Sequence, residues 1–144
     1  MTFGTFDLFH FGHLRLLERA RSLGDRLIVG ISTDRLNYDK KGRYPVFPQD
    51  ERSAIVRSLR CVDNVFYEES LEMKRDYLLS WSADVCVMGH DWSGRFDDLA
   101  DICEVIYLPR TEKVSTTELE LFIQERMPTE PKWLRDILEA SKNS

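Results

Sequence analysis

Two histidines, His10 and His13, stand three residues apart in the segment GTFDLFHFGH, residues 4–13. Histidines in such a pair serve as core residues, as metal ligands or as hydrogen-bond donors to a phosphate group. Gly12 lets a ligand approach the backbone closely, and the unpaired amides of a helix that begins here form an anion site. The chain has only 3 histidines, and no cluster of cysteines or glutamates accompanies this pair. We therefore predict a phosphate-handling site rather than a metal site.

Arg110 and Lys40 are the cations that we expect to join this site. Arg110 follows the apolar run VIYLP and precedes Ser115 and Glu118, which have the spacing of a helix capping box. A position between a strand end and a helix start favours a phosphate contact over a solvated arginine. Lys40 lies in YDKKGRYPVF, a segment rich in loop residues. It is either a solvated charge or part of a mobile lid that closes over phosphates.

A second polar cluster, GHDWSGRFDD, follows the apolar run DVCVM. Trp92 in this cluster is either an ordinary core residue or a cover over a base. Asp91 orients either a ligand or a metal-bound water. Arg60 and Asp63 are expected to form an ion pair that shapes the site without touching the ligand, and Arg52 is a further candidate for such a pair.

The elements that position these residues alternate between helix-like and strand-like patterns. We predict buried strands at residues 26–32, 64–67, 84–89 and 103–109, and helices at residues 13–24, 48–63, 70–82 and 115–127. This alternation predicts an α/β fold with a parallel sheet covered by helices on both faces. Ligands bind such sheets beyond the carboxyl ends of the strands, where the polar clusters fall. Residues 1–127 are predicted to form a single domain, and residues 128–144 a C-terminal tail with a short helix.

Bulk composition excludes several classes of protein. The net charge of -5 argues against a nucleic-acid binder, which needs a basic face. No apolar run approaches the roughly 20 residues that span a bilayer, and the N-terminus lacks the pattern of a signal peptide. We therefore expect a cytoplasmic protein that binds neither nucleic acid nor membrane. The 3 cysteines are odd in number and widely spaced, which predicts buried, unreactive thiols.

The GTFDLFHFGH segment resembles the signature loop of the cytidylyltransferases, which belong to the H-x-G-H nucleotidyltransferase superfamily. Three later segments match in order: RCVDNVF, VMGHDW and LPRTEKVSTTEL. The last is similar to the signature of glycerol-3-phosphate cytidylyltransferases, the subfamily that the chain resembles most. The resemblance implies a Rossmann-like, doubly wound parallel sheet. It also implies the transfer of CMP from CTP, with Mg²⁺, to a phosphorylated small alcohol such as sn-glycerol 3-phosphate, giving CDP-glycerol and pyrophosphate. By family analogy we expect a homodimer that supplies teichoic acid or capsule synthesis.

The resemblance also implies a role for each matching residue. Catalytic roles fall to His10, His13, Lys40 and Arg110, and substrate binding to Lys40 and Lys74. Nucleotide binding falls to residues from four segments of the chain: Thr5, Phe6, Asp7, Gly12, Gly89, Asp91, Trp92, Arg110, Thr111, Ser115, Thr116 and Thr117. The chain departs from the subfamily at Lys113, where glycine is usual, and at His90, where an acidic residue is common.

Two alternatives remain open at this point. Adenylyltransferases share the H-x-G-H motif, so the chain is alternatively an adenylyltransferase that uses ATP. A catalytically silent nucleotide-binding domain is the other alternative, against which the intact set of His10, His13, Arg110 and Ser115 argues. No protein metal site is predicted, because the chain lacks a cluster with metal-ligand spacing.

Overall fold

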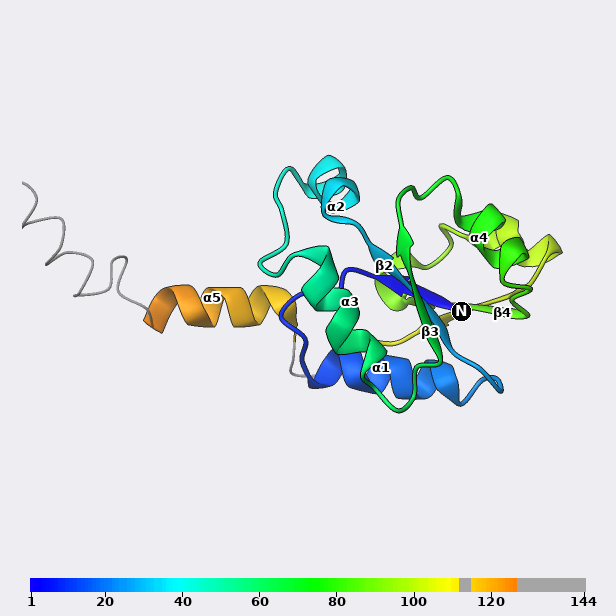
Figure 1. Ribbon diagram of the computed structural model, residues 1–144, viewed down its shortest axis with the longest axis horizontal. Helices are drawn as coiled ribbons and strands as arrows, with labels where there is room; N and C mark the ends of the chain where they lie inside the picture. The colour runs from blue at the N-terminus through cyan, green and yellow to red at the C-terminus, as the bar shows by residue number, and fades with distance from the viewer. Residues whose placement is uncertain (112–114, 127–144) are drawn as a thin grey trace, which may run out of the picture.

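A computed structural model describes residues 1–111 and 115–126 of the chain (Figure 1). These residues form one sheet of five parallel strands in the order β3-β2-β1-β4-β5. The strands are β1 (Thr2–Gly4), β2 (Ile28–Ser32), β3 (Asn64–Glu68), β4 (Val85–Gly89) and β5 (Glu104–Leu108). The predicted α/β fold with a doubly wound parallel sheet is confirmed.

The short strand β1 is the centre of the sheet. Its Thr2 lies opposite Val29 of β2 on one side and Val87 of β4 on the other. The chain therefore winds outward from β1 in one direction, through β2 to β3, and later in the other, through β4 to β5. In open sheets a ligand crevice forms at this reversal, outside the carboxyl ends of the strands. In this protein that point lies beyond Gly4 and Gly89.

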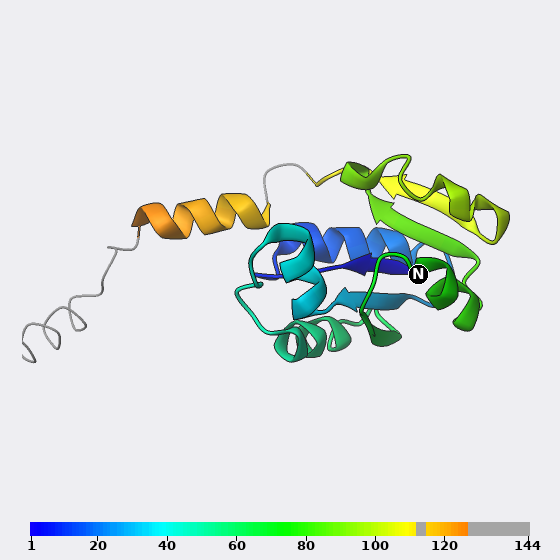
Figure 2. The same cartoon turned by 90° about the horizontal axis from the view of Figure 1, so that it is seen from above.

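Helices cover both faces of the sheet, as Figures 1 and 2 show. On one face, α1 (Phe11–Arg21) and α3 (Gln49–Arg57) bury Leu17 and Val56. On the opposite face, α4 (Lys74–Ser80) and the 3₁₀ helix η2 (Asp97–Asp101) bury Leu78 and Leu99. The 3₁₀ helix η1 (His90–Trp92) follows β4, and α5 (Thr116–Arg126) projects from one side of the body in both views.

Several predicted helix boundaries are wrong. The helix predicted at residues 48–63 ends at Arg57, and the helix predicted at residues 70–82 spans only Lys74–Ser80. The first helix begins at Phe11 rather than at His13, so His10 caps it and His13 lies in its first turn. The two overlong predictions have one origin, because turns beside a helix keep its apolar spacing while their hydrogen bonds close differently.

The helix α2 (Asp34–Lys41) lies where the sequence predicted a loop. The Thr33 side chain accepts the N–H of Leu36 at its start, and Lys40 and Lys41 lie in its last turn, where cations favour the helix dipole. Gly42, with a φ of 69°, ends it. The sequence analysis missed this helix because it is polar and lacks an apolar stripe; only Leu36 and Asn37 are buried.

Other predictions concern the cysteines, the membrane and the tail. Cys86 and Cys103 are buried and Cys61 is half-buried, all as free thiols, and burial raises the pKa of Cys86 to about 11. The predicted burial is confirmed for Cys86 and Cys103 but not for Cys61. Among the described residues, no helix has the length and apolar character needed to cross a membrane. The helix predicted in residues 128–144 lies outside the described residues.

Candidate active site

Two adjoining cavities open at the carboxyl ends of β1, β4 and β5. The first, which we name the β1 cavity, has a volume of about 310 Å³ and reaches from the loop after β1 to the segment between α2 and α3. The second, the β5 cavity, has about 280 Å³ and reaches along the end of β5 to the start of α5. Six residues line both cavities: His13, Leu16, Gly89, Asp91, Thr116 and Thr117. The two cavities are thus halves of one site.

The histidine pair forms the start of α1. His10 is the N-cap residue, and its Nδ1 accepts the N–H of Gly12 at 3.0 Å. The Nδ1 of His13 faces the N–H of His10 at 3.4 Å, and the two rings stack with centroids 3.8 Å apart. Because both Nδ1 atoms face backbone donors, the tautomer that satisfies these contacts carries hydrogen on both Nε2 atoms. Each imidazole therefore offers one N–H to a ligand.

Both imidazoles are neutral at physiological pH. Burial lowers the pKa of His13 from 6.5 to about 3, helped by His10 and opposed by the Asp7 carboxylate. Burial also lowers the pKa of His10. Neutral imidazoles can donate N–H groups but carry no positive charge, so positive charge in the site comes from lysine and arginine.

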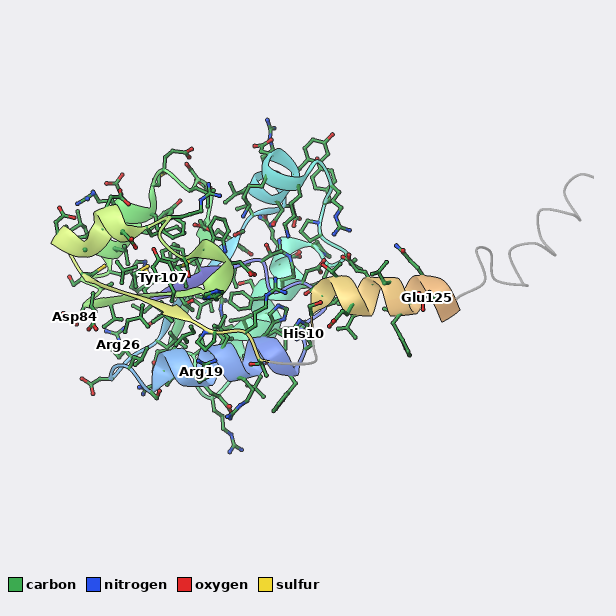
Figure 3. All side chains as sticks on the ribbon, turned by 180° about the vertical axis from the view of Figure 1, so that it is seen from behind. His10, Arg19, Arg26, Asp84, Tyr107 and Glu125 are labelled. Carbon is green, nitrogen blue, oxygen red and sulfur yellow. The ribbon has the colours of Figure 1, made fainter. Side chains whose placement is uncertain are left out.

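The start of α5 meets the start of α1 at this point. The Thr116 hydroxyl donates to the carbonyl of Asp7 at 3.2 Å and lies 3.4 Å from Nε2 of His10, from which it is separated by 106 residues in the chain. Ser115 caps α5, because its Oγ accepts the N–H of Glu118 at 3.1 Å. Figure 3 shows His10 at this junction. Two helix N-termini thus direct amides toward one cavity, as an anion site requires.

Arg110 adds a cation at the rim of the β5 cavity. Its guanidinium donates to Oδ2 of Asp91 from Nη2 at 2.7 Å and from Nε at 3.1 Å. This ion pair raises the pKa of Arg110, and both side chains are exposed. Arg19 of α1 donates to the carbonyl of Pro109 at 2.9 Å and so ties the end of β5 to α1. The phosphate-binding groups predicted from two distant segments are therefore brought together.

Comparison with known proteins identifies the family. Residues 1–124 match the model of the cytidylyltransferase-like family. The chain belongs to the cytidylyltransferase-like family. Glycerol-3-phosphate cytidylyltransferase of Bacillus subtilis (strain 168) is 48% identical over 120 residues, which cover 83% of this chain and 92% of that protein. The enzyme of the same name from Staphylococcus aureus (strain NCTC 8325 / PS 47) is 48% identical over 120 residues, or 83% of this chain and 90% of that protein.

A solved structure shares the fold. The lipopolysaccharide core biosynthesis protein from Thermoplasma volcanium GSS1 superposes with a TM-score of 0.68 at 23% identity, covering 78% of this chain and 96% of that one. At this identity the match supports the architecture and not the activity. The Rossmann-like sheet expected from the resemblance is confirmed.

Asp7 holds part of the β1 cavity together. Its carboxylate accepts the N–H groups of Val46 at 2.7 Å, Phe47 at 3.0 Å and Leu8 at 3.0 Å. These bonds fasten the segment after α2 to the loop after β1. Asp7 lines the β1 cavity, but its carboxylate oxygens already accept hydrogen bonds from backbone N–H groups of the protein.

The neighbours of Asp7 complete this wall of the cavity. Thr5 donates from Oγ1 to Oδ1 of Asn37 at 2.6 Å. Phe6 is buried, adopts a left-handed φ of 54° and sets its ring edge-on to that of His13. A phenylalanine at positive φ is strained, and such strain is held where the surroundings fix the chain around a functional group.

The lysines lie differently from the prediction. Lys40 and Lys74 are not part of the lining of either cavity, whereas Lys41 and Arg43 line the β1 cavity. Burial lowers the pKa of Lys40. The lining residues of this cavity that the sequence reasoning did not assign include Asn37, Lys41, Arg43 and Tyr44. The dense positive charge of KKGRY was the available signal, and the loop interpretation of this segment obscured it.

Arg52 is a buried hub rather than a ligand contact. Its side chain is 0% exposed, pairs with Asp34 at 2.7 Å and donates to the carbonyls of Phe47, Thr5 and Ser32. It therefore joins the ends of β1 and β2 to the segment after α2.

The ion pair predicted between Arg60 and Asp63 has a different partner. Asp63 pairs with Arg21 at 3.5 Å and accepts the N–H of Leu27 at 2.7 Å. The structural role predicted for Asp63 is confirmed, and the partner was wrong because α1 lies closer in space than the neighbouring turn.

Trp92 lies between the core and the site. Its ring packs against Phe96 with centroids 5.5 Å apart, and Arg95 lies over it at 5.3 Å. The same ring lines the β1 cavity. Trp92 therefore packs on the core while its ring also lines the site, and its role as a cover over a base stays a prediction.

Proposed function

We propose that the protein is a glycerol-3-phosphate cytidylyltransferase, which transfers CMP from CTP to sn-glycerol 3-phosphate and releases pyrophosphate. The observation that carries the proposal is the convergence of two neutral imidazoles and two helix N-termini around a double cavity. The relatives at 48% identity support CTP over ATP and glycerol 3-phosphate over other acceptors.

The chemistry needs alignment and charge stabilisation rather than a covalent enzyme group. We assign the triphosphate to the helix N-termini, where the Nε2–H groups of His10 and His13 donate to the α-phosphate. The acceptor phosphate enters from the β1 cavity, and one of its oxygens forms a bond to the α-phosphorus. The bond from that phosphorus to the β-phosphate bridging oxygen breaks in line, and pyrophosphate leaves with both bonding electrons. Arg110 and the α5 amides stabilise its charge.

Other binding roles belong to the same proposal. Gly12, Gly89, Thr111, Ser115, Thr116 and Thr117 surround the nucleotide, together with Thr5, Phe6, Asp7, Asp91 and Trp92 from the walls of the two cavities. Lys40 and Lys74 act on the acceptor phosphate through their charge from behind the cavity wall, because neither lines the two cavities. Mg²⁺ bound with the triphosphate would neutralise phosphate charge. Asp91 is the carboxylate common to the two linings and would help to hold the ion there.

Exposed apolar side chains on α5 support a homodimer. Leu121 and Ile123 are 53% and 43% exposed on a helix that projects from the body, and Phe11 is 60% exposed nearby at the start of α1. Exposed apolar side chains on a projecting helix favour its burial against a partner. Sedimentation equilibrium should show a dimer for the wild-type chain and a monomer for Leu121→Asp. We further place the enzyme in the cytoplasm, as a source of CDP-glycerol for teichoic acid or capsule synthesis.

The test of the activity is a substrate panel. The purified chain is incubated with Mg²⁺ and either CTP or ATP, together with glycerol 3-phosphate or ethanolamine phosphate, and products are identified by mass spectrometry. We expect CDP-glycerol with release of pyrophosphate, and at least tenfold less product in the other three combinations. A larger yield of an ADP-linked product or of CDP-ethanolamine would overturn the proposal.

A further inference from the structure

A buried ion pair lies directly behind the wall of the β1 cavity. Glu68 ends β3 and is 1% exposed, and Lys74 begins α4 and is 2% exposed. The ammonium of Lys74 donates to Oε1 of Glu68. Its Nζ also lies 3.6 Å from the centroid of the Phe3 ring and 4.8 Å from that of Phe96. Since Phe3 lines the cavity, one aromatic ring separates this ammonium from the space that we assign to the acceptor.

A chain of hydrogen bonds connects Glu68 to the same wall. Ser32 donates from Oγ to Oε2 of Glu68 at 2.8 Å, so both oxygens of the carboxylate are engaged. The side-chain amide of Asn37 donates to the carbonyl of Ser32 at 3.2 Å, and Thr5 donates to Asn37 at 2.6 Å. Thr5 and Asn37 line the β1 cavity. Glu68 therefore holds the Lys74 ammonium behind the wall and, through Ser32, the polar side chains of Asn37 and Thr5 within it.

Stability alone does not account for this pair. Replacing a buried ion pair by apolar residues of similar volume is often neutral or stabilising, because taking both charges out of water is costly. An ammonium has three donor hydrogens, and among the described residues Glu68 provides the oxygen acceptor that Lys74 uses. Burial lowers the pKa of Lys74 and of Lys40, and the Glu68 carboxylate opposes the shift in each. One carboxylate thus favours the charged form of both lysines near the cavity.

We propose that Glu68 is a positioning residue for the acceptor phosphate, which fixes the Lys74 ammonium behind Phe3 and fastens Thr5 and Asn37 in the cavity wall. The inference rests on the proposed function, because the phosphate in question is that of the acceptor. A fixed charge in a low-dielectric wall attracts a phosphate without reorganising when the phosphate arrives. Phe3 and Asn37, through which the pair reaches the site, line the β1 cavity and not the β5 cavity, so we expect the effect on the acceptor rather than on CTP.

The test compares Glu68→Gln with the matched control Glu69→Gln, which removes an adjacent exposed carboxylate. The KM for glycerol 3-phosphate at saturating CTP, the KM for CTP and the calorimetric Kd for CTP without acceptor are measured for each variant. Glu68→Gln should raise the KM for glycerol 3-phosphate by about tenfold or more, since hydrogen bonds to charged groups have this weight. The KM and Kd for CTP should change less than about twofold, and Glu69→Gln should match the wild type on this scale.

A purely structural role gives a different pattern. Equal rises in both KM values, or a lower Tm with an unchanged acceptor KM, would overturn the inference. Ser32→Ala removes one bond to Glu68 without stranding a charge, and it should produce a smaller rise in the acceptor KM with the same lack of effect on CTP. If Glu68→Gln does not fold, the acceptor KM of Ser32→Ala tests the positioning role of Glu68 instead. If the wild type accepts a different phosphorylated alcohol, the proposed function fails. The role of Glu68 is then decided by comparing the KM for that acceptor with the KM for CTP.

Discussion

His10 has two functions in the structure, and one substitution separates them. Its Nδ1 accepts the N–H of Gly12 at 3.0 Å and so caps α1, while its Nε2 faces the cavity 3.4 Å from the Thr116 hydroxyl. Asparagine is among the best N-cap residues, because its Oδ1 accepts the same kind of amide. It has no atom that reaches the position of Nε2. His10→Asn therefore removes the proposed phosphate donor and keeps the cap, whereas His10→Ala removes both.

The expected magnitudes follow from these contacts. Loss of one preorganised donor to a developing charge lowers kcat by about 10²–10³, or roughly 2.7–4 kcal/mol. We expect this loss in both variants. His10→Ala should additionally lose about 1 kcal/mol of stability with its cap, which lowers the Tm by roughly 3–4 °C in a chain of this length. His10→Asn should keep the wild-type Tm within about 1 °C.

The assay combines pyrophosphate release, at saturating CTP and glycerol 3-phosphate, with thermal unfolding followed by circular dichroism. A kcat for His10→Asn above about a tenth of the wild-type value would refute the donor role of Nε2. Equal losses of Tm in the two variants would refute the capping role of Nδ1, because asparagine would then replace it no better than alanine does.

Three further predictions concern the rest of the site. Because burial lowers the pKa of His13 from 6.5 to about 3, the unfolded chain binds a proton there that the native chain excludes. Its contribution to stability is therefore complete above pH 6.5 and falls by about 1.4 kcal/mol per pH unit below it, down to about pH 3. Urea unfolding should show a shallower pH slope for His13→Gln. Arg52→Met removes the donor to the Asp34 carboxylate and to the carbonyls of Thr5 and Phe47, so urea unfolding should show a loss of about 3–5 kcal/mol, and a loss below about 1 kcal/mol would contradict the hub role. Arg110→Ala removes an exposed cation, so the unfolding free energy should change by less than about 0.5 kcal/mol. The KM for CTP should rise at least tenfold. A KM for CTP that stays equal to that of the control Arg57→Ala would exclude the phosphate contact.

The sequence by itself determined the features that depend on near neighbours in the chain. Runs such as IVGIS predicted strands buried on both faces, because such strands need no polar alternation. The spacing of Ser115 and Glu118 predicted the start of α5, and that of His10 and His13 predicted an anion site at a helix start. The family, too, was predictable from these motifs and their order.

The tertiary structure alone decided which groups meet. Thr116 reaches His10 across 106 residues, and no local pattern encodes that contact because it depends on how β1 and β5 sit in the sheet. The burial of Lys74 was hidden for the same reason: the resemblance assigns this lysine to the acceptor phosphate, and the fold buries it against Glu68 and Phe3. A side chain's charge and spacing can be read along the chain, but its burial and its partners depend on packing between elements that the chain separates.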